Sequence, residues 1–121
     1  MKTGKKFTGA RYKKSRKKKL SERKGHVRQV TLGKEKKKKI KTTGGKLKTV
    51  LLRSEKVNVL DPKTKKCKVV KIKNVLEVPS NSFLVRRNVL VKNALIETEL
   101  GKARITNRPS QEASIQAILV A

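Results

Sequence analysis

This 121-residue chain has few of the residues that build disulfides or zinc sites, and it has no long apolar run. One cysteine and one histidine are too few for an internal disulfide or for a zinc site with four protein ligands. The lone Cys67 is better explained by core packing or an incidental thiol than by catalysis, and it is compatible with a reducing compartment. No apolar run approaches the roughly 20 residues of a membrane helix, and no apolar stretch follows the first charges as in a secretory signal. We therefore expect no metal, no cofactor and no membrane insertion.

Aromatic residues and candidate catalytic groups are also scarce. The single Tyr and two Phe cannot supply the paired aromatic platform of an RNA-recognition fold, so reading of unpaired bases is not expected. His26 lies inside a basic segment, where phosphate contact or solvent exposure is the better interpretation. Glu97 and Glu99 could form a carboxylate pair on one strand face. Salt bridges across a hairpin, to Lys102 and Arg104, explain them better, and we predict that the protein is not an enzyme.

Positive charge is present in excess, and it is unevenly distributed. The first 49 residues hold 21 of the 35 Lys and Arg residues against two acids, Glu22 and Glu35, which gives +19 of the formal +27. Residues 50–121 hold 14 basic and six acidic residues, a net charge of +8. Charge at this density repels itself and disfavours compaction, so a polyanionic partner is indicated.

Nucleic acid is the best candidate for that polyanion. A helix lying on a membrane surface needs an apolar face opposite its charges. The apolar residues that lie between positions 1 and 39 form no such stripe: Phe7, Ala10, Tyr12, Leu20, Val27, Val30 and Leu32. A nuclear-localisation tract or a solvated tail would be equally basic. A solubility tail does not need these apolar residues, which could pack into RNA grooves or against stacked bases.

Residues 1–39 are predicted to form an extended, conditionally ordered basic arm. The lysine runs 17–19 and 36–39 cannot bury themselves, and four glycines interrupt any long helix. A short helix around Lys13–Lys24 becomes possible once phosphates neutralise its charges. We therefore define residues 1–39 as a basic RNA-binding extension and residues 40–121 as a separate domain.

The second domain has the pattern of short β-strands. Gly44-Gly45 precedes an apolar segment and indicates a turn, because the full spacing of a phosphate-binding P-loop is missing. Further turns are predicted at 61–64, where Pro takes a favoured position, and at Gly101, which suits a tight hairpin. Residues 77–82 are predicted to be a loop, and the chain closes on an apolar strand at 115–120.

Alternation within these segments predicts which side chains share a face. Val70, Ile72 and Asn74 are expected on one face of a strand, and Val69, Lys71 and Lys73 on the other. A further strand is expected over 83–91. It contains Arg86 and Arg87, which in a strand point to opposite faces, whereas at a strand end or bulge both could reach phosphate. A structural salt bridge is the alternative for one of them.

About six short strands at roughly ten-residue spacing, with no convincing helix, indicate an all-β fold. A small closed or nearly closed β-barrel is favoured over a sandwich, because closure removes the exposed strand edges. Lys and Arg on such a body, as on the arm, would give strong, salt-dependent and largely sequence-independent binding to folded RNA.

Several motifs occur in the order found in one known family. They are Ile96-Glu97-Thr98-Glu99-Leu100-Gly101-Lys102-Ala103-Arg104-Ile105-Thr106-Asn107-Arg108-Pro109, Thr8-Gly9-Ala10-Arg11, Gly44-Gly45, Leu51-Leu52-Arg53, Asn58-Val59, Asp61-Pro62-Lys63-Thr64 and Val85-Arg86-Arg87-Asn88. Together they closely resemble small-subunit ribosomal protein number eight of the archaeal/eukaryotic type, which is distinct from the universal protein of the same number. The length resembles the short archaeal form.

The resemblance implies a small β-barrel with a basic N-terminal extension, which acts as a structural constituent of the small ribosomal subunit and binds 16S-type rRNA. The RNA contacts that it implies are Thr8, Gly9, Arg11, Gly44, Gly45, Arg53, Arg86, Arg87, Lys102, Arg104 and Arg108. From charge and position we add Lys5, Lys6, Tyr12, Lys13, Lys14, Arg16, Lys17, Lys18, Lys19, Arg23, Lys24, Arg28 and Lys46.

This hypothesis places the protein in the cytoplasm, on the ribosome. Its expected partners are small-subunit rRNA and neighbouring ribosomal proteins, with no membrane, no small-molecule substrate and no homo-oligomer. The alternatives are a related ribosome-assembly factor and a non-ribosomal binder of DNA or anionic lipid. The family often has Gly near the positions of Lys65, Asn93, Ser110 and Ala113, and Asn or a similar residue at Lys46, so the turn types at the first four positions are open, although Asn93 tolerates a positive φ.

Overall fold

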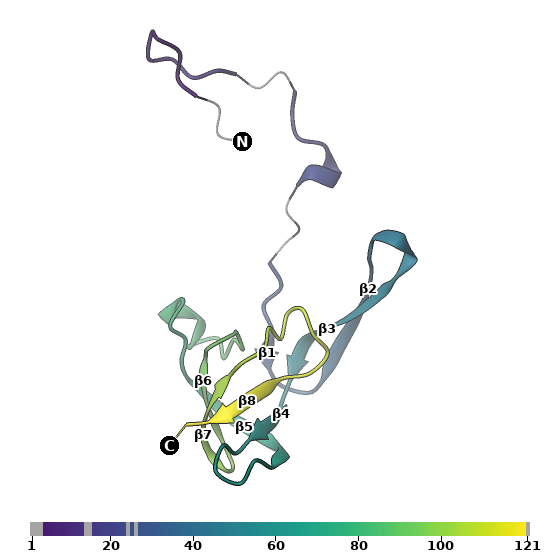
Figure 1. The fold of residues 1–121 in the computed structure, drawn as a ribbon, viewed down its shortest axis with the longest axis vertical. Coiled ribbons are helices and arrows are strands. Elements are labelled where there is room, and N and C mark those ends of the chain that lie inside the picture. Colours follow the sequence, from purple (N-terminus) through teal and green to yellow (C-terminus); the bar gives the residue numbers. More distant parts are fainter. Residues whose placement is uncertain (1–3, 14–15, 24, 26, 121) are drawn as a thin grey trace.

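The computed structural model describes residues 4–13, 16–23, 25 and 27–120. The N-terminal segment extends away from a β-rich body and joins that body near β1 (Figure 1). Three residues singled out in the sequence, Lys14, Lys24 and His26, lie outside the described residues.

Five strands close into a barrel, in the order in which they occur along the chain. They are β4 (Lys56–Leu60), β5 (Cys67–Glu77), β6 (Leu95–Thr98), β7 (Gly101–Ile105) and β8 (Gln116–Leu119). Neighbours pair antiparallel except at the closure, where β4 and β8 run parallel. The prediction of an all-β protein with a small closed barrel is confirmed.

Three further strands form a second sheet beside the barrel. They are β1 (Thr31–Leu32), β2 (Lys36–Lys41) and β3 (Leu47–Ser54), with β3 in the centre. β1 is parallel to β3, whereas β2 is antiparallel to it, so β2 and β3 form a hairpin. The hairpin extends outward from the barrel, and β3 continues almost directly into β4 (Figure 1). The domain division expected at residues 39 and 40 falls inside β2.

The barrel interior is filled by alternate residues of its strands. Val57 and Val59 of β4, and Ala103 and Ile105 of β7, are each at most 1% exposed. The residues between them are exposed, as period-two alternation requires. Small alanines beside branched side chains fit the narrow interior of a small barrel.

In β5 the alternation changes phase. Val70 and Ile72 are buried as predicted, but Asn74 is exposed and Val75 takes the inward position. The pairing with β6 shifts in register between Ile72 and Asn74, so β5 has one more residue than β6 at this point. The Asn74 Oδ1 accepts a hydrogen bond of 2.9 Å from the Val75 N–H. The placement of Asn74 with Val70 and Ile72 was wrong, because a bulge cannot be seen in a two-residue pattern.

The predicted strand at 83–91 is also wrong over most of its length. Residues 82–84 form a short 3-10 turn, η3 (Ser82–Leu84), followed by further turns, and only Val89 makes an isolated bridge, to Thr31. The Asn81 Oδ1 accepts a hydrogen bond of 3.0 Å from the Phe83 N–H and so starts the turn. Asn88 has φ 48°, which ends any extended run there.

The turns expected from the sequence are mostly confirmed. Thr98 pairs with Gly101 across the two-residue connection Glu99-Leu100, and Gly101, which follows it, has φ 125°. The buried Thr98 hydroxyl donates to the Gly101 carbonyl at 2.8 Å. Lys65 and Asn93 both have positive φ, 53° and 65°. Those two positions therefore keep the backbone conformation that glycine would favour, despite carrying side chains.

We expect Ile105→Ala to destabilise the barrel by about 2–5 kcal/mol, because the substitution leaves a cavity in a closed interior. Ile118 of β8 pairs with Arg104, the residue before Ile105, and its side chain is 37% exposed. Ile118→Ala is the matched control and should cost about 1 kcal/mol or less. Denaturant unfolding followed by circular dichroism measures both; equal losses would contradict the assignment of the interior.

Asp61 organises the loop between β4 and β5. Its Oδ2 accepts a bond of 2.8 Å from the Thr64 hydroxyl, and its Oδ1 accepts one of 3.0 Å from the Lys63 N–H. These two hydrogen bonds hold the pKa of Asp61 below its ordinary value, and the bond from the Thr64 hydroxyl has a larger effect than the bond from the Lys63 N–H. Its contribution to loop stability is therefore present above the unfolded pKa and is lost as pH falls through the lower folded pKa.

We expect Thr64→Val to raise the pKa of Asp61 toward the ordinary aspartate value, because it removes the first of these hydrogen bonds while keeping the side-chain shape. A carboxyl-detected NMR titration of the wild type and the variant measures the change. An unchanged titration midpoint in the variant would contradict the assigned cause.

Candidate nucleic-acid interface

The start of the described arm is a tight turn, which we call the arm turn (residues 5–11). Lys5 and Arg11 form an isolated antiparallel bridge, and the Lys6 N–H donates to the Ala10 carbonyl at 2.7 Å. Gly9 has φ 82°, a conformation that suits glycine. The turn places Phe7 in full contact with solvent. Predicted contacts 5, 6, 8, 9 and 11 are thus brought together on one turn.

Tyr12 follows the arm turn and is 55% exposed. The Lys6 ammonium lies over its ring, 5.5 Å from the centroid. A cation at this distance is attracted by the ring quadrupole. One face of Tyr12 is therefore occupied within the chain.

Arg16 is engaged by an acid of the arm itself. Its Nη2 and Nη1 donate to the two carboxylate oxygens of Glu22 at 2.7 Å and 3.0 Å. Glu22 also accepts from the Lys19 N–H at 3.2 Å and so caps the 3-10 turn η1 (Leu20–Glu22). The Arg16 hydrogen bond, with the smaller effect of the Lys19 N–H, lowers the pKa of Glu22. η1 is the only helical turn in the described part of the segment where a conditional helix was proposed.

The arm is fixed to the body by residues 28–32, which we call the arm root. Val30 is 1% exposed and belongs to the hydrophobic core, and its carbonyl accepts from the Leu90 N–H at 2.7 Å. The Leu32 N–H donates to the Asn88 carbonyl at 3.0 Å. Arg28, which is half-buried, donates from Nε to the Ser110 carbonyl at 3.4 Å.

Three arginine-bearing segments of the body meet at the arm root. Thr31 pairs with Arg53 of β3. The turn that contains Arg86 and Arg87 ends at Asn88, which bonds the arm root, and both arginines are exposed. The exposed Arg108 lies two residues before Ser110. Arginines that are far apart in sequence thus belong to segments joined at the point where the arm leaves the barrel.

Two other predicted contacts lie on a different part of the barrel. Lys102 and Arg104 are exposed, and both point outward from β7 because the residues on either side of Arg104 are buried. Lys102 lies opposite Glu97 on β6, as expected. Among the described residues, however, the salt bridges are Arg16–Glu22 and Glu35–Lys37, so the expected ion pairs across this hairpin are not formed.

Gly44, Gly45 and Lys46 form the tip of the β2–β3 hairpin. The 3-10 turn η2 (Thr43–Gly45) reverses the chain, and the Thr42 N–H donates to the Lys46 carbonyl at 2.7 Å. Both glycines have positive φ, 77° and 75°. The turn expected at Gly44-Gly45 is confirmed, and Lys46 is exposed beside it.

The remaining predicted contacts in the described arm are all exposed: Lys13, Lys17, Lys18, Lys19 and Arg23. The site prediction omitted the lysines of the hairpin strands, which are also exposed: Lys36, Lys37, Lys38, Lys39, Lys41 and Lys48. The run at 36–39 was the available signal. It was interpreted as part of an extended arm, and only strand pairing with β3 reveals that it forms a defined surface.

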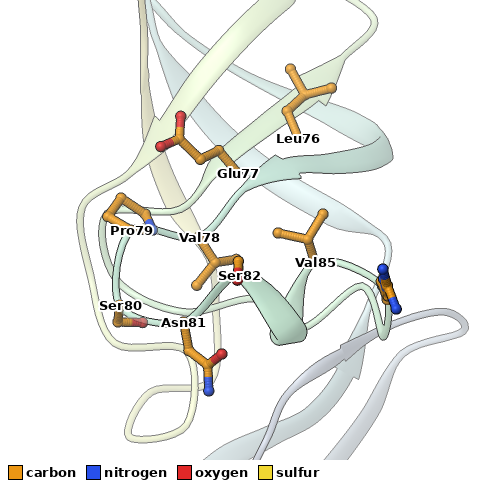
Figure 2. A pocket seen from close by; sticks show the side chains of 9 residues that line it. Leu76, Glu77, Val78, Pro79, Ser80, Asn81, Ser82 and Val85 are labelled. Carbon is orange, nitrogen blue, oxygen red and sulfur yellow. The ribbon is translucent and has the colours of Figure 1, made fainter.

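One hollow of the body lies beside the loop after β5. Figure 2 shows Ser80 and Asn81 on that loop and Val85 beyond η3, around a hollow that Glu77 also lines. Among the residues that the structure describes, no three His, Cys, Asp or Glu side chains gather in one place. Within the same part of the chain, no helix has the length and apolar character needed to cross a membrane.

Known proteins resemble the chain over nearly its whole length. A family described as Ribosomal protein S8e matches residues 1–120. A protein of Methanosphaera stadtmanae, named small ribosomal subunit protein eS8, is 38% identical over 113 residues, which is 93% of this chain and 90% of that one.

Two further relatives with the same name match a shorter segment. The protein of Methanocella arvoryzae is 58% identical over 65 residues, 54% of this chain and 52% of its own. That of Methanococcus aeolicus is 51% identical over 63 residues, 52% of this chain and 49% of its own. The matched segment thus spans about half the length of these two relatives. The family match and the nearly full-length relative are nevertheless decisive: the chain belongs to the Ribosomal protein S8e family.

Proposed function

We propose that the protein is a structural constituent of the small ribosomal subunit, bound to its 16S-type rRNA, and that it is not an enzyme. The observation that supports this most directly is the arrangement at the arm root. A core residue, Val30, fixes an exposed basic arm to the body where arginine-bearing segments meet. A protein with this role works on the ribosome in the cytoplasm, beside neighbouring ribosomal proteins.

The mechanism is electrostatic and topological. The barrel holds its exposed arginines in fixed positions, and Arg can bind phosphate in a bidentate manner. The part of the arm that precedes the arm root passes between RNA helices and neutralises phosphates with its lysines. Release of counterions from those phosphates supplies affinity that does not depend on sequence. Arm charge then supplies binding strength, and the body fixes the position of the protein.

The proposed contacts follow the exposed cations of both parts. Those near the arm root, Arg28, Arg53, Arg86, Arg87 and Arg108, form one group. Lys102 and Arg104 on β7 form a second group, and the arm turn forms a third. Three separate groups of cations allow one protein to join several segments of folded RNA.

We expect removal of residues 1–27 to leave the barrel folded, because Arg28, Val30 and all strands remain. The truncation removes twelve basic residues. If about half of them neutralise phosphates, the slope of log K against log salt should fall by about 4 units, and affinity should fall with it. Filter binding to small-subunit rRNA over a salt series measures both, with circular dichroism as the folding control.

An unchanged affinity and salt slope in the folded truncation would refute this mechanism. Equal affinity of the full chain for small-subunit rRNA, duplex DNA and anionic vesicles would instead favour a general binder of acidic surfaces. Enrichment in precursor particles, with loss from mature subunits, would favour an assembly factor.

We expect Glu22→Gln to strengthen RNA binding. The substitution removes one of the arm's few acids and releases the Arg16 guanidinium from its paired geometry, so one more phosphate contact can form. The salt slope should then steepen by about 0.7–0.9 units. Glu99→Gln, in the exposed turn between β6 and β7, is the matched control for loss of one negative charge. Weaker binding of Glu22→Gln would mean that η1 must be ordered for RNA contact.

A further inference from the structure

We infer that the β2–β3 hairpin is a two-sided wedge that lies between two separate phosphate backbones of the RNA, one on each face. This inference rests on the proposed function and adds how the hairpin engages the RNA. It assigns binding to lysines of β2 and β3 that the predicted set of RNA contacts did not include.

Strand register places lysines on both faces of the hairpin. Residues paired across strands share a face, and successive residues alternate. The first face carries Lys37, Lys39 and Lys41, opposite Leu51, Thr49 and Leu47. The second face carries Lys38 and Lys48, beside Ile40 and Val50. A register shift between Lys36 and Lys37 pairs Lys36 with Arg53, so Lys36 lies outside this regular alternation. The first face thus presents three lysines and the second presents two.

The outer edge of the hairpin is also accessible. In the sheet order β1-β3-β2, β2 is paired only with β3, so it is an edge strand. Every residue of β2 except Ile40 is exposed. A row of lysines on an edge strand opposes pairing with another protein strand. The chemistry of this surface therefore selects a polyanion rather than a further strand.

Protein acids neutralise little of this charge. Glu35 bonds Lys37, which lowers the pKa of that carboxyl, and the Lys48 Nζ donates to the Gln111 Oε1 at 2.7 Å. The salt bridges in the described chain leave Lys36, Lys38, Lys39 and Lys41 without a carboxylate partner. Unneutralised cations remain on both faces, so an anion on one face alone would leave the repulsion on the other.

The tip is shaped for close approach. Gly44 and Gly45 have no side chains, and no atom lies within 4 Å of the position that a Cβ would take at either residue. Next to the tip, each face carries one apolar side chain, Leu47 on the first and Ile40 on the second. Leu47 is 69% exposed. A tip with two glycines, flanked by apolar side chains and lysines, matches a gap whose walls are sugar-phosphate backbones.

The test compares two full-length double variants that remove the same charge from opposite faces. Lys39→Gln with Lys41→Gln acts on the first face, and Lys38→Gln with Lys48→Gln acts on the second. Hydroxyl-radical footprinting on small-subunit rRNA locates the protected riboses, and a salt series gives the slope. Lys63→Gln with Lys66→Gln, in the exposed β4–β5 loop, measures the loss caused by net charge alone.

We expect each face variant to lower the salt slope by about 1.4–1.8 units, beyond the control, because each removes two phosphate contacts. Each should also lose protection at its own set of nucleotides. The inference is overturned if both variants lose the same nucleotides, or if either loses no more than the control. If the wild-type chain itself shows no salt-dependent protection, the proposed function fails instead, which is a separate outcome.

Discussion

Repulsion between like charges is the constraint on which the architecture depends. A formal charge of +27 cannot be placed inside a small domain, because buried cations without partners are very costly. The chain keeps charged side chains out of its interior, where Val57, Ile96 and Ile105 are at most 1% exposed and the buried polar side chains, Ser54 and Thr98, are uncharged. Barrel closure supports this separation, since a closed sheet buries one face completely and leaves the other for charge.

The same constraint explains why the arm and the hairpin project from the body. Lysines spread along extended segments are further apart than lysines on a compact surface, so their repulsion is smaller and is better screened by salt. The cost is that such segments have few internal contacts. The arm is held chiefly at its root, by Val30 and the backbone bonds to residues 88 and 90. The hairpin is held at its base, where Val50 and Leu51 are buried.

The sequence was sufficient for the fold class because apolar alternation and turn residues are local signals. Val57, Val59, Val70 and Ile72 lie inside the barrel as their pattern required, and Gly101 lies at a tight hairpin. The failures arose where one residue interrupts the pattern. The bulge at Asn74 and the Asx-capped turn after Asn81 depend on pairing partners and on side-chain hydrogen bonds, which periodicity does not report.

The exposed cations were predictable as a list, but the surface that they form was not. Exposure of the described arm lysines follows from their density alone. The meeting of Arg53, Arg86 and Arg108 near the arm root does not, because it needs long-range contacts through Thr31, Asn88 and Ser110. The pairing of Arg16 with Glu22, six residues apart in an extended segment, was also outside any helix-based spacing rule.

The two kinds of cation are distributed in a way that suits their chemistry. Five of the 14 basic residues after position 49 are Arg, against four of the 21 before it. The planar guanidinium gains its bidentate phosphate geometry only when the backbone holds it in place, and the barrel and its ordered turns provide that support. The compact ammonium of Lys has no such requirement, so it suits a projecting strand or arm. Under the proposed function, rigid elements with Arg define the orientation of the protein, and projecting elements with Lys adapt to the RNA surface around it.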